Sequence, residues 1–476
     1  MLFNTIEFAV FFIFVTGVYW MLNHRWQNLF LLATSYFFYS VWDYRFLSLI
    51  LLFTLIHYFC GIRIYESESS KKRKAFLALG VISSLAILGV FKYYNFFAEN
   101  FQILLNAVGF HMSFRRLNII LPVGLSFYTF QSMSYTFDIY RGQLKPTRNI
   151  VDFALFIAFY PQLFAGPINR ATKLLPQIIN PRNFSKKQIG DGLYFILWGL
   201  FKKMFIADNM ARIAQYVFMT PAANLTGLEI FLGVVAYTFQ IYCDFSGYSD
   251  IALGVAKCMG IEIMVNFKRP YLALSPNEFW SRWHISLSSW LRDYLYMPLA
   301  NRFGMRYRNI LITMFIAGLW HGAGWTFILW GLYHGIIQVI YIIIYRLFAN
   351  PLAEKKEKSV FAEKFSFAVR WLIMIFLVMF SWLIFSSESV SQTGEMFLGI
   401  FSSWRMTPLA NMFLRHIVFF CWFLVVVDVW DFIHEKKKKK IHHFGIFARI
   451  NFYLFIILSI IFFGIFEETQ FVYFQF

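Results

Sequence analysis

Long apolar stretches recur from one end of this 476-residue sequence to the other, and they constrain the fold more than any other feature. They include residues 8–22, 28–41, 46–61, 75–91 and 413–427. A helix needs about 20 mostly apolar residues to cross the hydrocarbon core of a bilayer. Only 14% of the residues are charged, whereas soluble domains carry roughly 25%. The pattern predicts an all-α, polytopic integral membrane protein with about ten to twelve transmembrane helices. Interfacial or re-entrant helices are expected around a central buried site.

The formal net charge of +18 comes from short basic clusters that lie between the apolar stretches. This distribution is typical of the positive-inside rule, with anionic lipid as a further partner, and it does not resemble a nucleic-acid groove. The clusters at 63–74 and 436–440 therefore predict cytoplasmic loops, and both termini are expected outside. The first apolar stretch is followed by His-Arg-Trp at 24–26 and is interpreted as a permanent span, not a cleaved signal.

The four cysteines are dispersed and lie mostly in apolar segments, which predicts free buried thiols and no disulfide framework. No linker divides the chain, so a single domain is expected over residues 1–476. Its middle, about residues 117–335, holds most of the Gly, Pro and polar interruptions. Irregular backbone at membrane depth is tolerated only where protein or a wet cavity surrounds it. The catalytic core is therefore expected within this middle part.

The segment SPNEFWSRWHISLSSWLRDYLYMP begins with three helix-start signals at residues 275–278. Serine suits the N-cap, proline the first helical position, and Glu278 a capping box. The pattern predicts one helix that lies at the membrane interface and ends before Pro298. His284 would then share its apolar face with Trp280. Spacing alone favours a core or interface histidine bonded to a backbone carbonyl.

Seven cations surround this segment, and they are Lys268, Arg269, Arg282, Arg292, Arg302, Arg306 and Arg308. Such a cluster would attract a phosphate-bearing donor such as a coenzyme A thioester. The candidate phosphate contacts are Lys268, Arg269, Arg282 and Arg292. The simpler interpretation, ordinary positive-inside loop charge, is favoured for most of the seven.

Two further histidines lie in the apolar stretch AGLWHGAGWTFILWGLYHGI at 317–336. A helix from Arg308 would place His321 roughly 20 Å from the basic surface at 1.5 Å per residue, and glycines 322 and 324 predict a break after it. Both histidines sit in GxxxG packing motifs, so each is either a packing residue or a functional ionisable group. Burial favours the neutral imidazole that a general base needs. Spacing does not choose between His321 and His334, and no metal site or G-x-S-x-G nucleophile is predicted.

These residues resemble the membrane-bound O-acyltransferase family, and most closely its bacterial alginate O-acetyltransferase branch. The resemblance is carried by NEFWSRWHISLSSWLRDYLYMPLA and GLWHGAGWTFILWGLYHG. It is supported by LPVGLSFYTFQSMSYTFDIYRG at 121–142, FYPQLFAGPI at 159–168 and YCDFSGYSDIALG at 242–254. It covers most of the chain beyond about residue 90.

The resemblance implies that His321 is the catalytic base, that His284 is the second catalytic position, and that His334 is structural. It implies an acyl thioester co-substrate like acetyl-CoA, with no bound cofactor, and transfer of the acyl group across a bacterial inner (cytoplasmic) membrane. The expected partner is an extracytoplasmic SGNH-type acetyltransferase. The expected final acceptor is an envelope polysaccharide, either an alginate-like exopolysaccharide or peptidoglycan.

Three alternatives remain open at the level of sequence. The first is D-alanyl transfer to teichoic acid, within the same family. The second is a transporter or flippase of an envelope precursor, with Asp138, Asp208, Asp244 and Asp250 as candidate relay acids. The third is a binding or scaffold role without catalysis.

Overall fold

The computed structural model of the chain describes residues 1–164, 166–305, 307–348, 359–435 and 445–467. These residues form helices joined by turns and loops, and no β-strand occurs among them. The prediction of an all-α protein is therefore confirmed. Contacts group the chain into two units, of which unit 1 holds residues 1–196 and 248–265, and unit 2 holds residues 197–247 and those from 266 onwards. A single domain over residues 1–476 stays a prediction.

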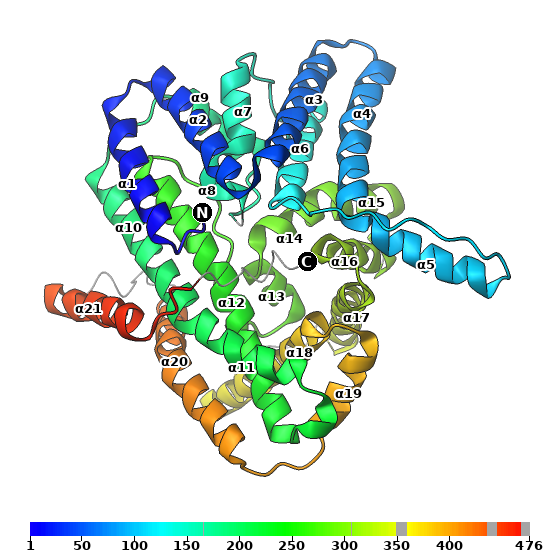
Figure 1. Cartoon of the computed structure of the whole chain (residues 1–476), viewed down its shortest axis with the longest axis vertical. Helices are drawn as coiled ribbons and strands as arrows, with labels where there is room; N and C mark the ends of the chain where they lie inside the picture. Colours follow the sequence, from blue (N-terminus) through cyan, green and yellow to red (C-terminus); the bar gives the residue numbers. More distant parts are fainter. Residues whose placement is uncertain (165, 306, 349–358, 436–444, 468–476) are drawn as a thin grey trace. The chain divides into compact units, whose positions relative to one another are not determined.

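Unit 1 is built mainly from the N-terminal helices. Helices α3, α4 and α6 pack together, and α2 packs against α7 (Figure 1). Aromatic side chains fill the interior, as where the rings of Tyr135 and Phe153 lie 4.4 Å apart. The helices are α1 (Ile6–Met21), α2 (His24–Asp43), α3 (Leu47–Glu66), α4 (Ser70–Leu88), α5 (Tyr94–Ala107), α6 (Leu125–Tyr140), α7 (Ile150–Ala158), α8 (Tyr160–Leu163) and α9 (Ala171–Ile179). Two more, α10 (Lys186–Leu200) and α12 (Gly227–Cys258), contribute to both units.

Unit 2 contains the rest of the helices and all three candidate histidines. The helices are α11 (Asp208–Met219), α13 (Pro276–Arg282), α14 (Ile285–Leu291), α15 (Met297–Phe303), α16 (Tyr307–His321), α17 (Trp325–Phe348), α18 (Val360–Ser386), α19 (Val390–Ile400), α20 (Pro408–Ile433) and α21 (Ile446–Phe463). Helix α17 packs against both α16 and α18 (Figure 1). Two π-helical segments, η3 (Phe201–Ala207) and η6 (Arg292–Tyr296), interrupt the regular helices.

Glycines set the close approach of α16 and α17. A Cβ added to Gly331 would lie 2.3 Å from the carbonyl oxygen of Met314, and one added to Gly318 would lie 2.2 Å from that of Phe327. Only glycine fits at either position, because a side chain would overlap the backbone of the facing helix. The packing role predicted for these motifs is therefore confirmed at Gly318 and Gly331.

Seven helical stretches of the described chain are long and apolar enough to cross a membrane. They are 24–66, 70–107, 227–258, 325–348, 361–386, 408–433 and 446–463. The chain is thus an integral membrane protein, and a total of ten to twelve crossings stays a prediction. The lysine clusters at 355–358 and 436–440 and the terminal FVYFQF lie outside the described residues.

The prediction of one continuous helix from residue 276 to Pro298 is wrong. The predicted start is confirmed, because the Ser275 hydroxyl accepts a hydrogen bond from the Glu278 amide and proline occupies the first turn. However, α13 ends at Arg282, and the chain re-enters a helix only at Ile285. Pro298 lies in the first turn of α15, where a missing N–H is tolerated. The break at residues 283–284 determines where His284 points.

Candidate active site

The structure brings the three histidines of the sequence motifs together in unit 2, with His284 beside His321 and with Trp330 in contact with both His321 and His334. The ring centroids of His284 and His321 are 6.5 Å apart. The ring of Trp330 lies 4.8 Å from that of His321 and 4.8 Å from that of His334. The relative exposures of the histidines are 0%, 3% and 0% in chain order. Three ionisable side chains from separate segments thus share one buried aromatic environment.

His284 is held in the break between α13 and α14 by Asn266. Its φ of 41° is left-handed, which an ordinary residue adopts only when its surroundings impose it. The backbone carbonyl of Asn266 accepts from the Ile285 amide at 2.9 Å. The side-chain oxygen of Asn266 accepts from the Ser286 amide at 3.1 Å and from the Ser286 hydroxyl at 2.9 Å. One asparagine therefore fixes the backbone on the C-terminal side of the histidine.

The same amide oxygen lies 3.2 Å from Nδ1 of His284. Because an amide oxygen only accepts, Nδ1 carries the proton and Nε2 of the neutral ring holds the lone pair. His284 lies outside the seven apolar stretches, and burial lowers its pKa to about 3. Its ring packs edge-on against Phe245 at 4.7 Å. The expected bond to a backbone carbonyl is thus replaced by a bond to a side-chain amide.

His321 is the last residue of α16, directly before the break at residues 322–324. The predicted interruption after this histidine is therefore confirmed. Rings enclose the imidazole on several sides, at 5.1 Å for Trp320, 4.8 Å for Trp330 and 5.3 Å for Phe385. The His321 side chain is buried, and it does not line the pocket described below.

His334 lies one helix further on, in α17, inside a box of four rings. They are Phe279 at 6.0 Å, Trp280 at 5.0 Å, Trp330 at 4.8 Å and Tyr333 at 5.6 Å. Neither ring nitrogen of His334 has a hydrogen-bond partner among the described residues. The indole nitrogens of Trp280 and Trp330 likewise have no hydrogen-bond partner among the residues that the structure describes. Such a concentration of unsatisfied buried groups is rare in a protein core.

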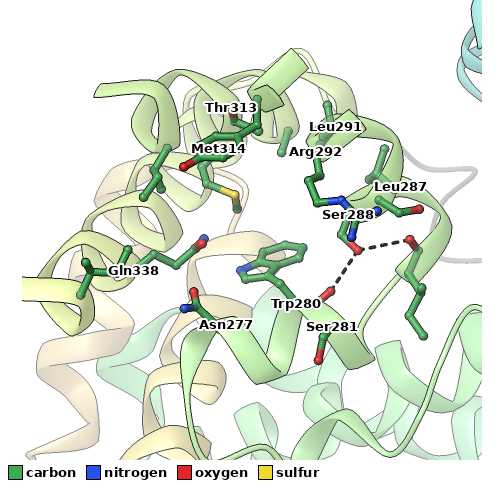
Figure 2. Close-up of a pocket in the computed structure, with 16 residues that line it drawn as sticks. Asn277, Trp280, Ser281, Leu287, Ser288, Leu291, Arg292, Thr313, Met314 and Gln338 are labelled. Carbon is green, nitrogen blue, oxygen red and sulfur yellow. Dashed lines mark hydrogen bonds between the residues drawn. The ribbon is translucent and has the colours of Figure 1, made fainter. Parts of the chain in front are cut away.

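A pocket of about 460 Å³ in unit 2 opens beside this box (Figure 2). Its rim carries the exposed residues Asn277, Ser281 and Arg292, and its inner wall includes the buried Ala317. Trp280 lines it centrally, with its indole nitrogen turned toward the side of Asn277 and Gln338 (Figure 2). The other lining residues are Ile285, Leu287, Ser288, Ser289, Leu291, Tyr296, Ile310, Thr313, Met314 and Ile342.

The four candidate phosphate contacts differ in their surroundings. Arg292 lines the pocket, is exposed, and pairs with its neighbour Asp293 at 2.8 Å. Arg269 pairs with Glu435 at 2.9 Å, and Arg282 pairs with Glu278 at 3.0 Å. The backbone amide of the exposed Lys268 donates to the Arg282 carbonyl, and the Arg282 guanidinium donates to the Lys268 carbonyl at 3.2 Å. Arg292 is therefore the one of these four that combines exposure with a place at the pocket.

The remaining predicted cations lie elsewhere in the same region. Arg302 and Arg308 both stack over the ring of Phe303, and Arg306 lies outside the described residues. Two of the candidate relay acids, Asp208 and Asp244, form ion pairs with the buried Lys203. The distance from Lys203 Nζ to a carboxylate oxygen is 2.8 Å in each pair. This pairing compensates buried charge.

Asn266 and the tryptophans around His334 were missed by reasoning from the sequence. Asn266 is separated from His284 by 18 residues, and no helical or strand periodicity links the two. The sequence does show that both histidine segments are rich in tryptophan. Nothing in their spacing showed that Trp280 and Trp330 face the same imidazole.

Comparison with known proteins identifies the family of this chain. The sequence model of the membrane-bound O-acyltransferase family matches residues 31–362. The chain is 40% identical over 400 residues to the probable alginate O-acetylase of Pseudomonas syringae pv. tomato, covering 83% of this chain and 74% of the relative. It is 32% identical over 472 residues to the peptidoglycan O-acetyltransferase of Helicobacter pylori, covering 92% and 83%.

A shorter match, 30% identical over 282 residues, is to the teichoic acid D-alanyltransferase of Streptococcus thermophilus, covering 56% of this chain and 68% of the relative. The family match extends over both histidine motifs and over Asn266. The chain is a member of the membrane-bound O-acyltransferase family and is an acyltransferase.

Proposed function

We propose that this protein moves an acetyl group from a cytosolic thioester donor across the membrane, for O-acetylation of an extracytoplasmic envelope polysaccharide. The observation that carries the proposal is the buried pair of His321 and His284, the latter with its ring oriented by Asn266. The names of the longest-matching relatives, an alginate O-acetylase and a peptidoglycan O-acetyltransferase, indicate acetyl as the group. The shorter match to the D-alanyltransferase makes D-alanyl transfer the less favoured alternative.

In the proposed reaction His321 removes the proton from the acceptor hydroxyl. The oxygen attacks the thioester carbonyl, the carbon–sulfur bond breaks, and the protonated imidazole returns its proton to the departing thiolate. The reaction is thus proton-neutral overall. His284, 6.5 Å away between ring centroids, acts as an acceptor through Nε2, which orients either His321 or the incoming hydroxyl.

The donor is proposed to enter from the cytoplasmic side through the pocket of Figure 2. Arg292 at the rim supplies positive charge for phosphate groups, supported by Lys268, Arg269 and Arg282 nearby in sequence. The buried wall at Ala317 lies one helical turn before His321. A thin acylated arm that follows this wall would bring its thioester toward the catalytic base.

The acetyl group is proposed to pass to an SGNH-type acetyltransferase outside the membrane, which then modifies an alginate-like exopolysaccharide or peptidoglycan. The membrane is taken to be the bacterial inner (cytoplasmic) membrane. The names of the relatives support the two glycans as acceptors. The SGNH-type partner and the inner membrane are what the family resemblance implies. Deleting genes for SGNH-type proteins in the host and measuring ester-linked acetate on each glycan tests the acceptor. An unchanged acetate content on both glycans would contradict it.

Replacing His321 with alanine tests the catalytic assignment. The expected result is loss of acetyl transfer by at least a hundredfold, because general-base catalysis contributes about 10²–10⁴-fold. Membranes that contain the full-length protein are incubated with labelled acetyl-CoA. The label that has left the thioester and become bound to the acceptor is then counted. His416→Ala, a histidine of α20 that bonds the Met412 carbonyl, serves as the matched control. Full activity of His321→Ala would overturn the assignment, and no transfer from acetyl-CoA by the wild-type protein would exclude this donor.

A further inference from the structure

The box around His334 raises a question that the proposed reaction leaves unanswered. Four buried polar atoms, namely both ring nitrogens of His334 and the indole nitrogens of Trp280 and Trp330, have no hydrogen-bond partner among the described residues. Leaving a buried donor or acceptor unpaired costs about 1–3 kcal/mol. A residue with a packing role alone would be better replaced by an apolar ring. The polar atoms therefore indicate that something else binds here.

The position of the box indicates what binds. On one side the ring of Trp280 faces the pocket, and on the other it contacts His334 at 5.0 Å and Trp330 at 5.8 Å. Trp330 in turn contacts His321 at 4.8 Å. Gln338, one turn after His334, lines the pocket and donates to the His334 carbonyl at 3.3 Å. Trp280 thus lies between the pocket on one side and His334 and Trp330 on the other.

We propose that Trp280, Trp330 and His334 form a binding junction for the amide-bearing arm of the acyl thioester donor, with His334 as a positioning residue. This inference rests on the proposed acyl transfer and adds a binding role that the resemblance does not assign to His334. A neutral imidazole presents one donor and one acceptor, and each indole one donor. An arm that carries amide and thioester carbonyls together with amide N–H groups satisfies all four atoms. The Trp280 ring must turn aside for the arm to pass.

The occupant is assigned to the donor and not to the acceptor hydroxyl because of the pocket that adjoins the junction. Its rim holds Arg292, a cation suited to the phosphates of such a donor. Its wall alternates apolar residues such as Met314 with the amides of Asn277 and Gln338.

Kinetics with acetyl-CoA test the role of His334. His334→Phe keeps a flat ring but removes both hydrogen-bonding atoms, and it is expected to raise the KM for acetyl-CoA about tenfold with kcat within about threefold. His334→Gln restores a donor and an acceptor and is expected to recover most of the loss. Trp280→Phe removes one donor, so a smaller rise in KM is expected. Tyr345→Phe, an exposed position of the same helix, is the control.

Binding measured without turnover separates this inference from the proposed function. Binding of labelled acetyl-CoA to purified full-length His321→Ala is compared with binding to His321→Ala/His334→Phe, and about tenfold weaker binding is expected in the double variant. Equal binding, or a fall in kcat without a change in KM, would overturn the positioning role while leaving the catalytic assignment of His321 intact. Activity retained in His321→Ala would instead overturn the proposed function. If the KM for the glycan acceptor rises and the KM for the donor does not, the junction would be assigned to the acceptor instead.

Discussion

At the scale of single residues, Asn266 organises the candidate site, because its side chain contacts both His284 and Ser286. Three groups converge on the Asn266 side-chain oxygen, from His284 and from the amide and hydroxyl of Ser286. The carboxamide thereby fixes the left-handed backbone of His284 and the location of its ring proton. Asn266 thus gives the His284 imidazole both an orientation and a defined tautomer, which the role proposed for it requires.

Graded removal of these bonds gives a prediction at this scale. Asn266→Ala is expected to lower the free energy of unfolding by about 2–4 kcal/mol, because each buried hydrogen bond contributes roughly 1 kcal/mol and the abandoned partners add a penalty. Ser286→Ala, which removes only the hydroxyl bond, is expected to cost about 1 kcal/mol. Thermal unfolding of the purified variants in detergent measures both. Equal losses in the two variants would show that Asn266 is not the centre of the network.

At the scale of elements, two helices of similar apolar composition meet because glycines allow their backbones to touch. Helices α16 and α17 approach at Gly318 and Gly331, and this contact places His321 beside Trp330. The break after α16 and the break at His284 then turn the ends of the helices toward each other's aromatic rings. His284 and His321 thus lie at helix ends, whereas Trp330 and His334 lie within α17 and share one face of it.

Gly331→Ala is expected to destabilise the protein by about 1–3 kcal/mol, the usual cost of overpacking. Its Cβ would lie 2.3 Å from the Met314 carbonyl oxygen, so the two helices must separate. Gly394→Ala in α19 is the matched control, because nothing lies within 4 Å of its added Cβ. Unfolding temperature and acetyl transfer are the two measurements. An unchanged unfolding temperature for Gly331→Ala would refute a close backbone contact.

At the scale of the whole molecule, charge and apolar length decide how the chain lies in the membrane. The basic cluster at 63–74 follows three helices, α1, α2 and α3. The positive-inside rule places this cluster in the cytoplasm. The last described helix, α21, follows the lysine-rich segment and leads to Glu467. This sequence of helices and basic clusters predicts that residues near 69 and residues near 467 lie on opposite sides of the membrane.

Single cysteines test this orientation. Ser69→Cys is expected to react with a membrane-impermeant maleimide only in inverted vesicles, and Glu467→Cys only in intact cells. Both positions are exposed, and the positive-inside rule predicts them on opposite sides of the membrane. The four native cysteines are free and buried, as predicted, so their labelling is expected to be weak. Labelling of both positions from the same side would refute the predicted topology.

The sequence by itself determined the features that depend on local chemistry. Apolar length determined the helical membrane class, the capping signals determined the start of α13, and the glycines determined the end of α16 and its contact with α17. These signals act over a few residues, so a pattern of letters contains them. The motifs also brought out His284 and His321 as candidates, with their catalytic roles still a prediction.

Tertiary structure alone decided how these pieces meet. The helix expected through His284 is broken because Asn266, 18 residues away, bonds the backbone at the break. The indoles of Trp280 and Trp330 face His334 because two helices cross there. Such contacts join positions that no period connects, and their free energy exists only once the chain has folded. That is why the sequence marked the histidines but gave no indication of what surrounds them.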